Sequence, residues 1–314
     1  MLSGEYAVLL GAEALAFTLD TFLDVYVSVS DDECFHISSQ FWNRELVFKN
    51  FEDEVLKPYQ GPLLKALQRA QEIYKNPPLM INIPYSFDKT AGVGSSSAVI
   101  LASCLASSLY VSEFSKEECC ELSWKIQRSL QGQASGYDVF TQAYGGLVSY
   151  RMNECHKIKS VEIDEANFRD YIHIYAGGKG SSTQTLLQDC LAYIEKEKIH
   201  ESLLKVSEEL TQCLKYFLQK GRDFDSVLKS VDNHSNLLSA FPHAPRDLCE
   251  CLKNLDGYGE TWTFKTTGAG GEDSLLFLGR ESDLKEAKKY MQDRGWYPLL
   301  ANFSTQGLTV EEFK

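Results

Sequence analysis

Lys89-Thr-Ala-Gly-Val-Gly-Ser-Ser-Ser-Ala98 is a cluster of glycine and hydroxyl residues between a short apolar run at residues 79–84 and a helix-forming run at residues 99–111. Glycine lets the backbone approach an anion closely. The serines would form the first turn of the helix, where N–H groups without partners and the helix dipole favour negative charge. The cluster therefore predicts a phosphate cradle for a nucleotide. Its expected residues are Gly92, Val93, Gly94, Ser95, Ser96, Ser97 and Ala98.

The cradle differs from the two commonest phosphate loops. Ser95, not Lys, follows Gly94, so the P-loop ending is absent, and Ser97 stands where the dinucleotide fingerprint has its third glycine. A glycine-rich connection whose serines only cap a helix is the alternative interpretation. Other parts of the chain have to decide between the two.

Two further clusters lie near the ends of the chain: Leu2-Ser-Gly-Glu-Tyr-Ala-Val-Leu-Leu-Gly-Ala12 and Lys265-Thr-Thr-Gly-Ala-Gly-Gly-Glu-Asp-Ser274. With the cradle, and in this order, they resemble the three motifs of the GHMP kinases, which include galactokinase, homoserine kinase, mevalonate kinase and phosphomevalonate kinase. The resemblance spans nearly the whole chain. It implies ATP and Mg²⁺ as cofactors and an α+β fold of two subdomains with the active site in the cleft between them.

The pattern of the chain fits this organisation. Strand-like and helical segments alternate in the first half: strands are expected at residues 22–29, 34–38, 46–49, 79–83 and 145–150, and helices at 63–74, 99–111 and 116–131. The second half is mainly helical, at residues 183–216 and 226–252 with breaks at Gly221 and at residues 242–245, and has strands at 171–175, 261–265, 274–278 and 296–300. We expect an N-terminal ATP-binding subdomain at residues 1–160 and a C-terminal subdomain at 161–314.

Asp138 lies in Ser135-Gly-Tyr-Asp138, which looks like the Ser-Gly-x-Asp segment of the mevalonate branch of the family. The resemblance makes Asp138 the carboxylate beside the substrate hydroxyl, where it would accept the proton or orient the oxygen that attacks the γ-phosphorus. Without the other motifs, an aspartate after Gly136 would be read as a turn or helix cap.

Metal and phosphate contacts are also implied by family position. Ser96 would direct its hydroxyl to Mg²⁺, and Gln127 occupies the place of a second metal ligand, which is Glu in mevalonate kinases. An ordinary exposed helix position is the alternative for Gln127. Lys89 is close to a phosphate-binding lysine of phosphomevalonate kinases and is our second candidate catalytic residue, a solvated lysine being the alternative.

The acceptor site is assigned by the same resemblance. Residues 181–183 would open a helix that faces the substrate, or simply cap it, and the glycines after Lys265 would close over the phosphoryl groups or form a plain hairpin turn. The candidate acceptor-binding residues are Glu5, Tyr6, Ser135, Gly136, Ser181, Ser182, Thr183, Gly268, Ala269, Gly270, Gly271 and Asp273.

The composition of the chain argues against several classes of protein. The 314 residues carry 31 Lys plus Arg against 44 Asp plus Glu, a net charge of −13, which argues against nucleic-acid and anionic-membrane partners. Nine cysteines without a C-x-x-C pair suit reduced thiols in a cytoplasmic enzyme. The sequence shows no apolar span of membrane length and no signal peptide. The expected partner is a small anionic substrate, and the chain is a monomer or a homodimer.

We therefore expect an ATP-dependent kinase of the mevalonate branch, most like phosphomevalonate kinase because of Gln127 and Asp273. Mevalonate kinase, a sugar kinase of the same superfamily and a GHMP-fold metabolite binder without turnover remain alternatives. The family usually has a Pro-Gly-Lys element just before the first motif. Here it would precede residue 1, so either the natural chain extends upstream or the role of that lysine has moved.

Overall fold

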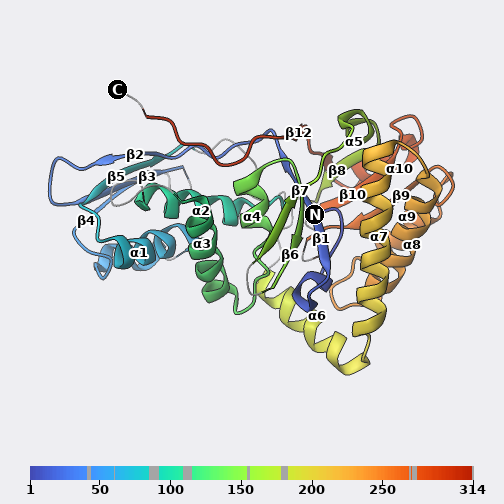
Figure 1. Ribbon diagram of the computed structural model, residues 1–314, viewed down its shortest axis with the longest axis horizontal. Helices are drawn as coiled ribbons and strands as arrows, with labels where there is room; N and C mark the ends of the chain where they lie inside the picture. The colour runs from blue at the N-terminus through green and yellow to red at the C-terminus, as the bar shows by residue number, and fades with distance from the viewer. Residues whose placement is uncertain are drawn as a thin grey trace. The chain divides into compact units, whose positions relative to one another are not determined.

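The computed structural model describes residues 1–40, 44–59, 61–84, 92–108, 115–153, 156–177, 183–268, 270 and 274–312 (Figure 1). Helices and strands are mixed, as expected for an α+β chain. The strands are β1 Glu13–Leu19, β2 Tyr26–Val29, β3 Phe35–Ser39, β4 Arg44–Phe48, β5 Leu79–Ile83, β6 Leu147–Arg151, β7 Lys157–Ser160, β8 Ile172–Ala176, β9 Trp262–Thr266, β10 Ser274–Gly279, β11 Tyr297–Pro298 and β12 Phe303–Ser304.

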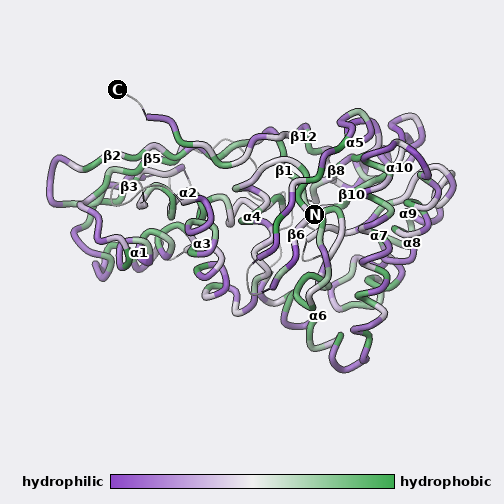
Figure 2. The backbone as a smooth tube through the Cα atoms, in the orientation of Figure 1, coloured by the Kyte–Doolittle hydropathy of each residue, from purple (hydrophilic) through white to green (hydrophobic). Residues whose placement is uncertain are grey.

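The helices are α1 Pro62–Tyr74, α2 Ser95–Ser108, α3 Lys116–Gln131, α4 Tyr137–Tyr144, α5 Glu165–Tyr171, α6 Thr183–Glu197, α7 His200–Lys220, α8 Phe224–Leu238, α9 Arg246–Lys253 and α10 Lys285–Gln292. Short 3₁₀ turns cover Ala7–Leu10 and Glu54–Tyr59. Hydrophobic and hydrophilic stretches alternate along most of these helices (Figure 2), as expected where one face packs on a core.

The chain packs into two compact units. Unit 1 contains the described residues of Met1–Asp20, Lys89–Val93 and Phe140–Lys314, and unit 2 those of Thr21–Asp88 and Gly94–Val139. Both units are discontinuous in sequence, whereas the expected subdomains 1–160 and 161–314 are contiguous. The subdomain boundary at residue 160 stays a prediction.

Unit 2 is built on a four-stranded sheet in the order β2-β5-β3-β4, in which only β3 and β5 are parallel. Buried and exposed side chains alternate along β5, so one face of the sheet is buried. Leu63, Leu64 and Leu67 of α1 and Val99 of α2 pack on that face. Ile100 and Cys104 of α2 join Leu122 and Ile126 of α3 in a second cluster, which fixes α2 against α3.

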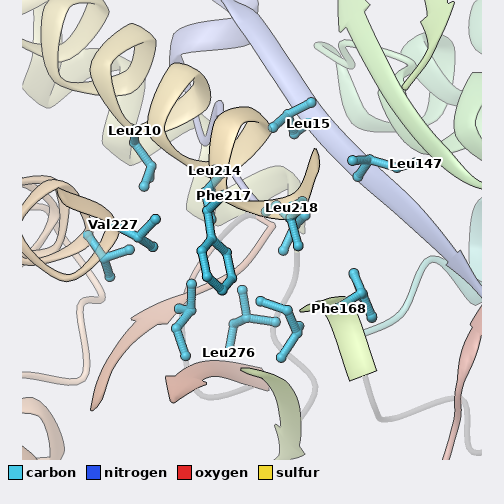
Figure 3. Close-up of a cluster of buried hydrophobic side chains, with 13 residues drawn as sticks. Leu15, Leu147, Phe168, Leu210, Leu214, Phe217, Leu218, Val227 and Leu276 are labelled. Carbon is cyan, nitrogen blue, oxygen red and sulfur yellow. The ribbon is translucent and has the colours of Figure 1, made fainter. Parts of the chain in front are cut away.

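Unit 1 contains two antiparallel sheets, in the orders β12-β1-β6-β7 and β11-β8-β10-β9. Its main core brings together side chains from both sheets and from α5, α7 and α8. In Figure 3 the leucines and Phe217 of α7 converge with Val227 of α8 and Leu276 of β10. Burial of this large apolar area supplies most of the driving force for folding of the unit.

Most of the expected elements are confirmed, with differences that have local causes. The helix expected at residues 183–216 is interrupted where Lys198 adopts a left-handed conformation (φ 55°), which separates α6 from α7. The expected strand at 296–300 is reduced to Tyr297–Pro298, because Pro298 lacks an N–H for the sheet ladder. The final turns expected for the helix at 99–111 lie outside the described residues.

Within the described parts of the chain, no helix is both long enough and apolar enough to cross a membrane.

Candidate functional site

The cradle has the backbone geometry that its sequence predicts. Gly92 and Gly94 adopt φ of 65° and 84°, a region that side-chain-bearing residues rarely enter. Helix α2 begins at Ser95, and the Ala98 N–H donates to the Gly94 carbonyl over 3.1 Å. The N–H groups of the first turn have no acceptor within the helix, so they can bind an anion.

Asp138 lies beside this helix start. Its Oδ2 accepts hydrogen bonds from Ser97 Oγ and from Gln127 Nε2, the latter at 2.8 Å. Gln127 Nε2 also donates to Ser97 Oγ at 3.0 Å, and the Val139 N–H donates to Asp138 Oδ1 at 3.0 Å. A carboxylate, a hydroxyl and an amide from three helices therefore meet at the N-terminus of α2.

The segment before α4 explains how Asp138 reaches this place. Trp124 of α3 donates its indole N–H to the Ala134 carbonyl over 2.8 Å, which ties the segment to α3. Ser135 is buried, and Gly136 turns the chain with φ 81° so that α4 starts at Tyr137. Asp138 thus occupies the first turn of α4, where the helix dipole stabilises a carboxylate.

The two candidate metal ligands differ in their surroundings. Gln127 is buried, so the alternative of an exposed helix position is wrong. Ser96 is exposed, and it is its neighbour Ser97 that contacts Gln127 and Asp138. A metal role for Ser96 stays a prediction.

Six predicted site residues lie outside the described part of the chain: Lys89, Ser181, Ser182, Ala269, Gly271 and Asp273. Thr183 is the first residue of α6, as expected for a residue that opens a helix. Gly268 follows β9 with φ 71°.

The first and third sequence clusters meet in unit 1. Lys265 of β9 donates to Glu5 Oε1 and, over 2.8 Å, to the Thr266 carbonyl. His234 Nε2 of α8 lies 3.6 Å from Glu5 Oε2. All three side chains are almost completely shielded from solvent. The Glu5 carboxylate, which we expected to bind the acceptor, is thus paired within the protein.

Burial and charge determine the protonation states in this cluster. Burial opposes ionisation of Glu5, but Lys265 and His234 outweigh it and hold the pKa of Glu5 below its usual value. Burial lowers the pKa of His234 to about 4, although Glu5 acts in the opposite direction. At neutral pH Glu5 and Lys265 therefore form an ion pair beside a neutral imidazole.

Tyr6 and Gly270 line a small pocket that also belongs to unit 1. A Cβ at Gly270 would stand 3.4 Å from the Tyr6 hydroxyl. Burial, with contributions from Cys190 and Glu5, raises the pKa of Tyr6 well above its usual value, so the phenol stays protonated. Lys265, Thr266 and Ser235 form the other polar lining, and the rest comprises Leu238, Ser239, Phe241, Pro242, Ala244, Pro245, Cys249 and Phe264.

Sequence reasoning assigned no role to Lys265 or His234. Lys265 could have been found, because it is the one charged residue of the strand Trp262–Thr266 next to the third cluster. His234 follows Val227 and Val231 at helical spacing and precedes Leu238, so it falls on the buried face of α8. A polar residue on such a face requires a partner, but the pattern does not say which one.

Among the described residues, no group of three or more His, Cys, Asp or Glu side chains is placed to hold a metal ion. This is compatible with Mg²⁺, which keeps several waters and binds through one or two carboxylates together with substrate phosphates. Asp138 and the hydroxyls of the α2 start offer such a sparse set.

The fold and this site define a class of protein. Residues 62–146, which include the cradle and Asp138, match the model of the GHMP kinases N terminal domain. This part of the chain is a GHMP kinase N-terminal domain, and the protein is an ATP-dependent phosphotransferase.

Several individual kinases are similar to this chain. The mevalonate kinase of Saccharolobus solfataricus is 29% identical over 223 residues, which cover 68% of this chain and 67% of that protein. The crystal structure of Methanococcus jannaschii mevalonate kinase has a TM-score of 0.70 at 20% identity and covers 96% of this chain and 95% of its own. Streptococcus pneumoniae phosphomevalonate kinase, in complex with phosphomevalonate and AMPPNP, has a TM-score of 0.73 at 19% identity and covers 96% of each chain. These two structures support the fold.

Proposed function

We propose that this kinase transfers the γ-phosphoryl group of ATP to a small acidic acceptor of the mevalonate pathway, with phosphomevalonate as the first candidate. The observation that carries the proposal is the position of Asp138. Its carboxylate is held by Ser97 at the start of α2, where the cradle would bind the phosphates of ATP. A carboxylate beside a phosphate site can take the proton of a hydroxyl acceptor or accept a hydrogen bond from a protonated phosphate acceptor.

The residues of the site would have the following roles in the reaction. The N–H groups of Ser95, Ser96 and Ser97 in the first turn of α2 bind the β- and γ-phosphates and orient them. Where the acceptor is a hydroxyl, Asp138 accepts its hydrogen bond and then its proton; where the acceptor is a phosphate, Asp138 accepts a hydrogen bond from the protonated oxygen of that phosphate while an ionised oxygen attacks. Mg²⁺, when bound, would neutralise charge on the phosphates, with Asp138 and the hydroxyls of Ser96 or Ser97 as the protein groups near it.

Unit 1 contains a small pocket of its own with the composition of a small-molecule site. Its wall is mainly apolar, with Phe241, Pro242 and Phe264 among its members. Its polar groups are the Tyr6 phenol, the Ser235 hydroxyl and the segment from Lys265 to Thr266. Such a combination of apolar wall and few polar groups is typical of small-molecule sites.

Two acceptors deserve a direct comparison. Gln127 is neutral, so the cluster brings one carboxylate to the phosphate site, which suits a phosphate acceptor because its oxygen is already ionised. The curated relatives in the comparisons are mevalonate kinases, which favours mevalonate as the second candidate.

A reducing compartment such as the cytoplasm is also part of the proposal. The described cysteines are all free thiols, and Cys104, Cys119, Cys120 and Cys190 are buried. Secreted proteins of this kind usually pair their cysteines.

The experiment is a coupled assay of ADP release with phosphomevalonate, mevalonate and a set of sugars as acceptors. We expect turnover with phosphomevalonate, and turnover with mevalonate alone would establish the second candidate. Turnover only with sugars would contradict the proposal. Nucleotide binding without turnover on any acceptor would identify a metabolite binder instead.

A further inference from the structure

Gln127, Ser97 and Asp138 form a closed triangle of hydrogen bonds. Gln127 Nε2 donates to Asp138 Oδ2 and to Ser97 Oγ, which lie on the same side of the amide, and the hydroxyl of Ser97 donates to Asp138 Oδ2. The second carboxylate oxygen, Oδ1, accepts the Val139 N–H. Asp138 is thus held at both oxygens, and Oδ2 is held twice.

The orientation of the Gln127 amide follows from this arrangement. If the amide were flipped, Oε1 would lie 2.8 Å from Asp138 Oδ2, and two oxygens without a proton between them would repel. In this orientation Gln127 Oε1 is buried and has no hydrogen-bond partner among the described residues. An unpaired buried acceptor costs about 1–3 kcal/mol. The fold therefore accepts an unpaired carbonyl in order to direct the amide nitrogen toward Asp138 and Ser97.

The elements that carry the triangle are packed against each other. Gln127 lies on α3 next to Ile126, and Ser97 lies on α2 two residues before Val99. Ile126 packs with Ile100 and Cys104 of α2, so the distance between the two helices is fixed by a buried apolar contact. Gln127 and Ser97 are themselves buried. Such support allows a side chain to hold a partner within a narrow range of positions.

We infer that Gln127 is a positioning residue that acts through Asp138, holding Oδ2 in place by its amide N–H together with the hydroxyl of Ser97. The inference rests on the proposed function, in which Asp138 contacts the acceptor. It assigns Gln127 a role different from metal binding, because its nitrogen, not its oxygen, is directed into the cluster. It also explains why a neutral amide suits position 127: a carboxylate there would stand within hydrogen-bond distance of Asp138 Oδ2.

The first test removes the amide and keeps the length of the side chain. Gln127→Met should lower kcat about tenfold or more while the KM for ATP stays within about twofold, because misplacement of a catalytic group affects the transition state more than nucleotide binding. Gln131→Met is the matched control, since it makes the same change at the end of the same helix. The control should keep wild-type kcat. Equal losses in both variants would overturn the inference, and so would a loss in Gln127→Met that only follows a lower melting temperature.

The second test separates positioning from metal binding. Gln127→Glu brings two carboxylates together, so their repulsion should displace Asp138 and lower kcat. The Mg²⁺ concentration for half-maximal activity should change little in Gln127→Met. A lower Mg²⁺ requirement and higher turnover in Gln127→Glu, with a raised Mg²⁺ requirement in Gln127→Met, would show a metal ligand and overturn the inference.

A crystal structure needs no acceptor, so it tests the positioning role of Gln127 separately from the proposed function. In a crystal structure of Gln127→Met, Asp138 Oδ2 should lie in a different position from that in the wild type, whereas Gln131→Met should leave it unchanged. An unmoved Asp138 in Gln127→Met would overturn the inference even if the enzyme is an active kinase. A moved Asp138 in a protein without turnover would sustain the hydrogen-bond role of Gln127 and contradict only the proposed function.

Discussion

The imidazole of His234 has no exposed surface. Two charged side chains act on its pKa: Glu5 raises it and Lys265 lowers it. Its pKa of about 4 in the folded protein is below the ordinary value of 6.5. The unfolded chain therefore binds the proton first as the pH falls, and stability should be lost between pH 6.5 and about pH 4, at about 1.4 kcal/mol per pH unit.

His234→Leu removes the titrating group and leaves the ion pair of Glu5 and Lys265 in place. Between pH 7 and pH 5, urea unfolding should show that the wild type loses about 2 kcal/mol more stability than the variant. Parallel pH dependences for the two proteins would contradict the assignment of a neutral buried imidazole.

Ser96 and Ser97 of the cradle should differ in function. Ser97→Ala removes the hydroxyl that donates to Asp138 and should lower kcat about tenfold with little change in Mg²⁺ requirement. Ser96→Ala should instead raise the Mg²⁺ requirement, as family position implies for this exposed hydroxyl. Activity measured against Mg²⁺ concentration checks both. An unchanged titration in Ser96→Ala would reject its metal role.

At the scale of an element, the start of α2 depends on the left-handed conformation of Gly94. Gly94→Ala introduces a side chain at φ 84°, which costs about 1–2 kcal/mol and distorts the cradle. We expect about tenfold weaker binding of a non-hydrolysable ATP analogue by calorimetry. Gly295→Ala is the matched control, because Gly295 has φ 79° and nothing lies within 4 Å of the position that a Cβ would occupy. A similar loss of binding in the control would contradict the account.

At the scale of the whole molecule, each compact unit has a core of its own. Leu67 packs in the core of unit 2 and Leu214 in that of unit 1. Replacement of either leucine by Ala should cost about 2–5 kcal/mol. Native-state hydrogen exchange should show that Leu67→Ala reduces amide protection mainly in β3 and β5, and Leu214→Ala mainly in β8 and β10. Equal loss of protection in both units for either variant would contradict this division.

The sequence predicted much of this organisation because its strongest signals are local. Glycines with serines predicted the start of α2, and strand β5 and helix α3 have the expected bounds. Strand β1 was not predicted, because its Glu-Ala-Leu-Ala run lacks a strand pattern and its conformation depends on pairing with β6 and β12.

Two features of the side-chain clusters described above also depend on contacts between segments that are distant in sequence. The choice of Ser97 over Ser96 as the partner of Asp138 is set by how α2 packs on α3. The pairing of Glu5 with Lys265 joins residues 260 positions apart. Neither feature can be predicted from a local sequence pattern. The same holds for the two discontinuous units, which depend on contacts between distant segments.

The most direct test of the central claim compares the wild type with Asp138→Asn, in steady-state ADP release and in equilibrium binding of ATP. The account predicts that the variant binds ATP with nearly wild-type affinity and turns over about 10² times more slowly or worse, because an acid–base group is lost while the cradle is kept. Near-wild-type turnover in Asp138→Asn would remove Asp138 from the mechanism and contradict the account.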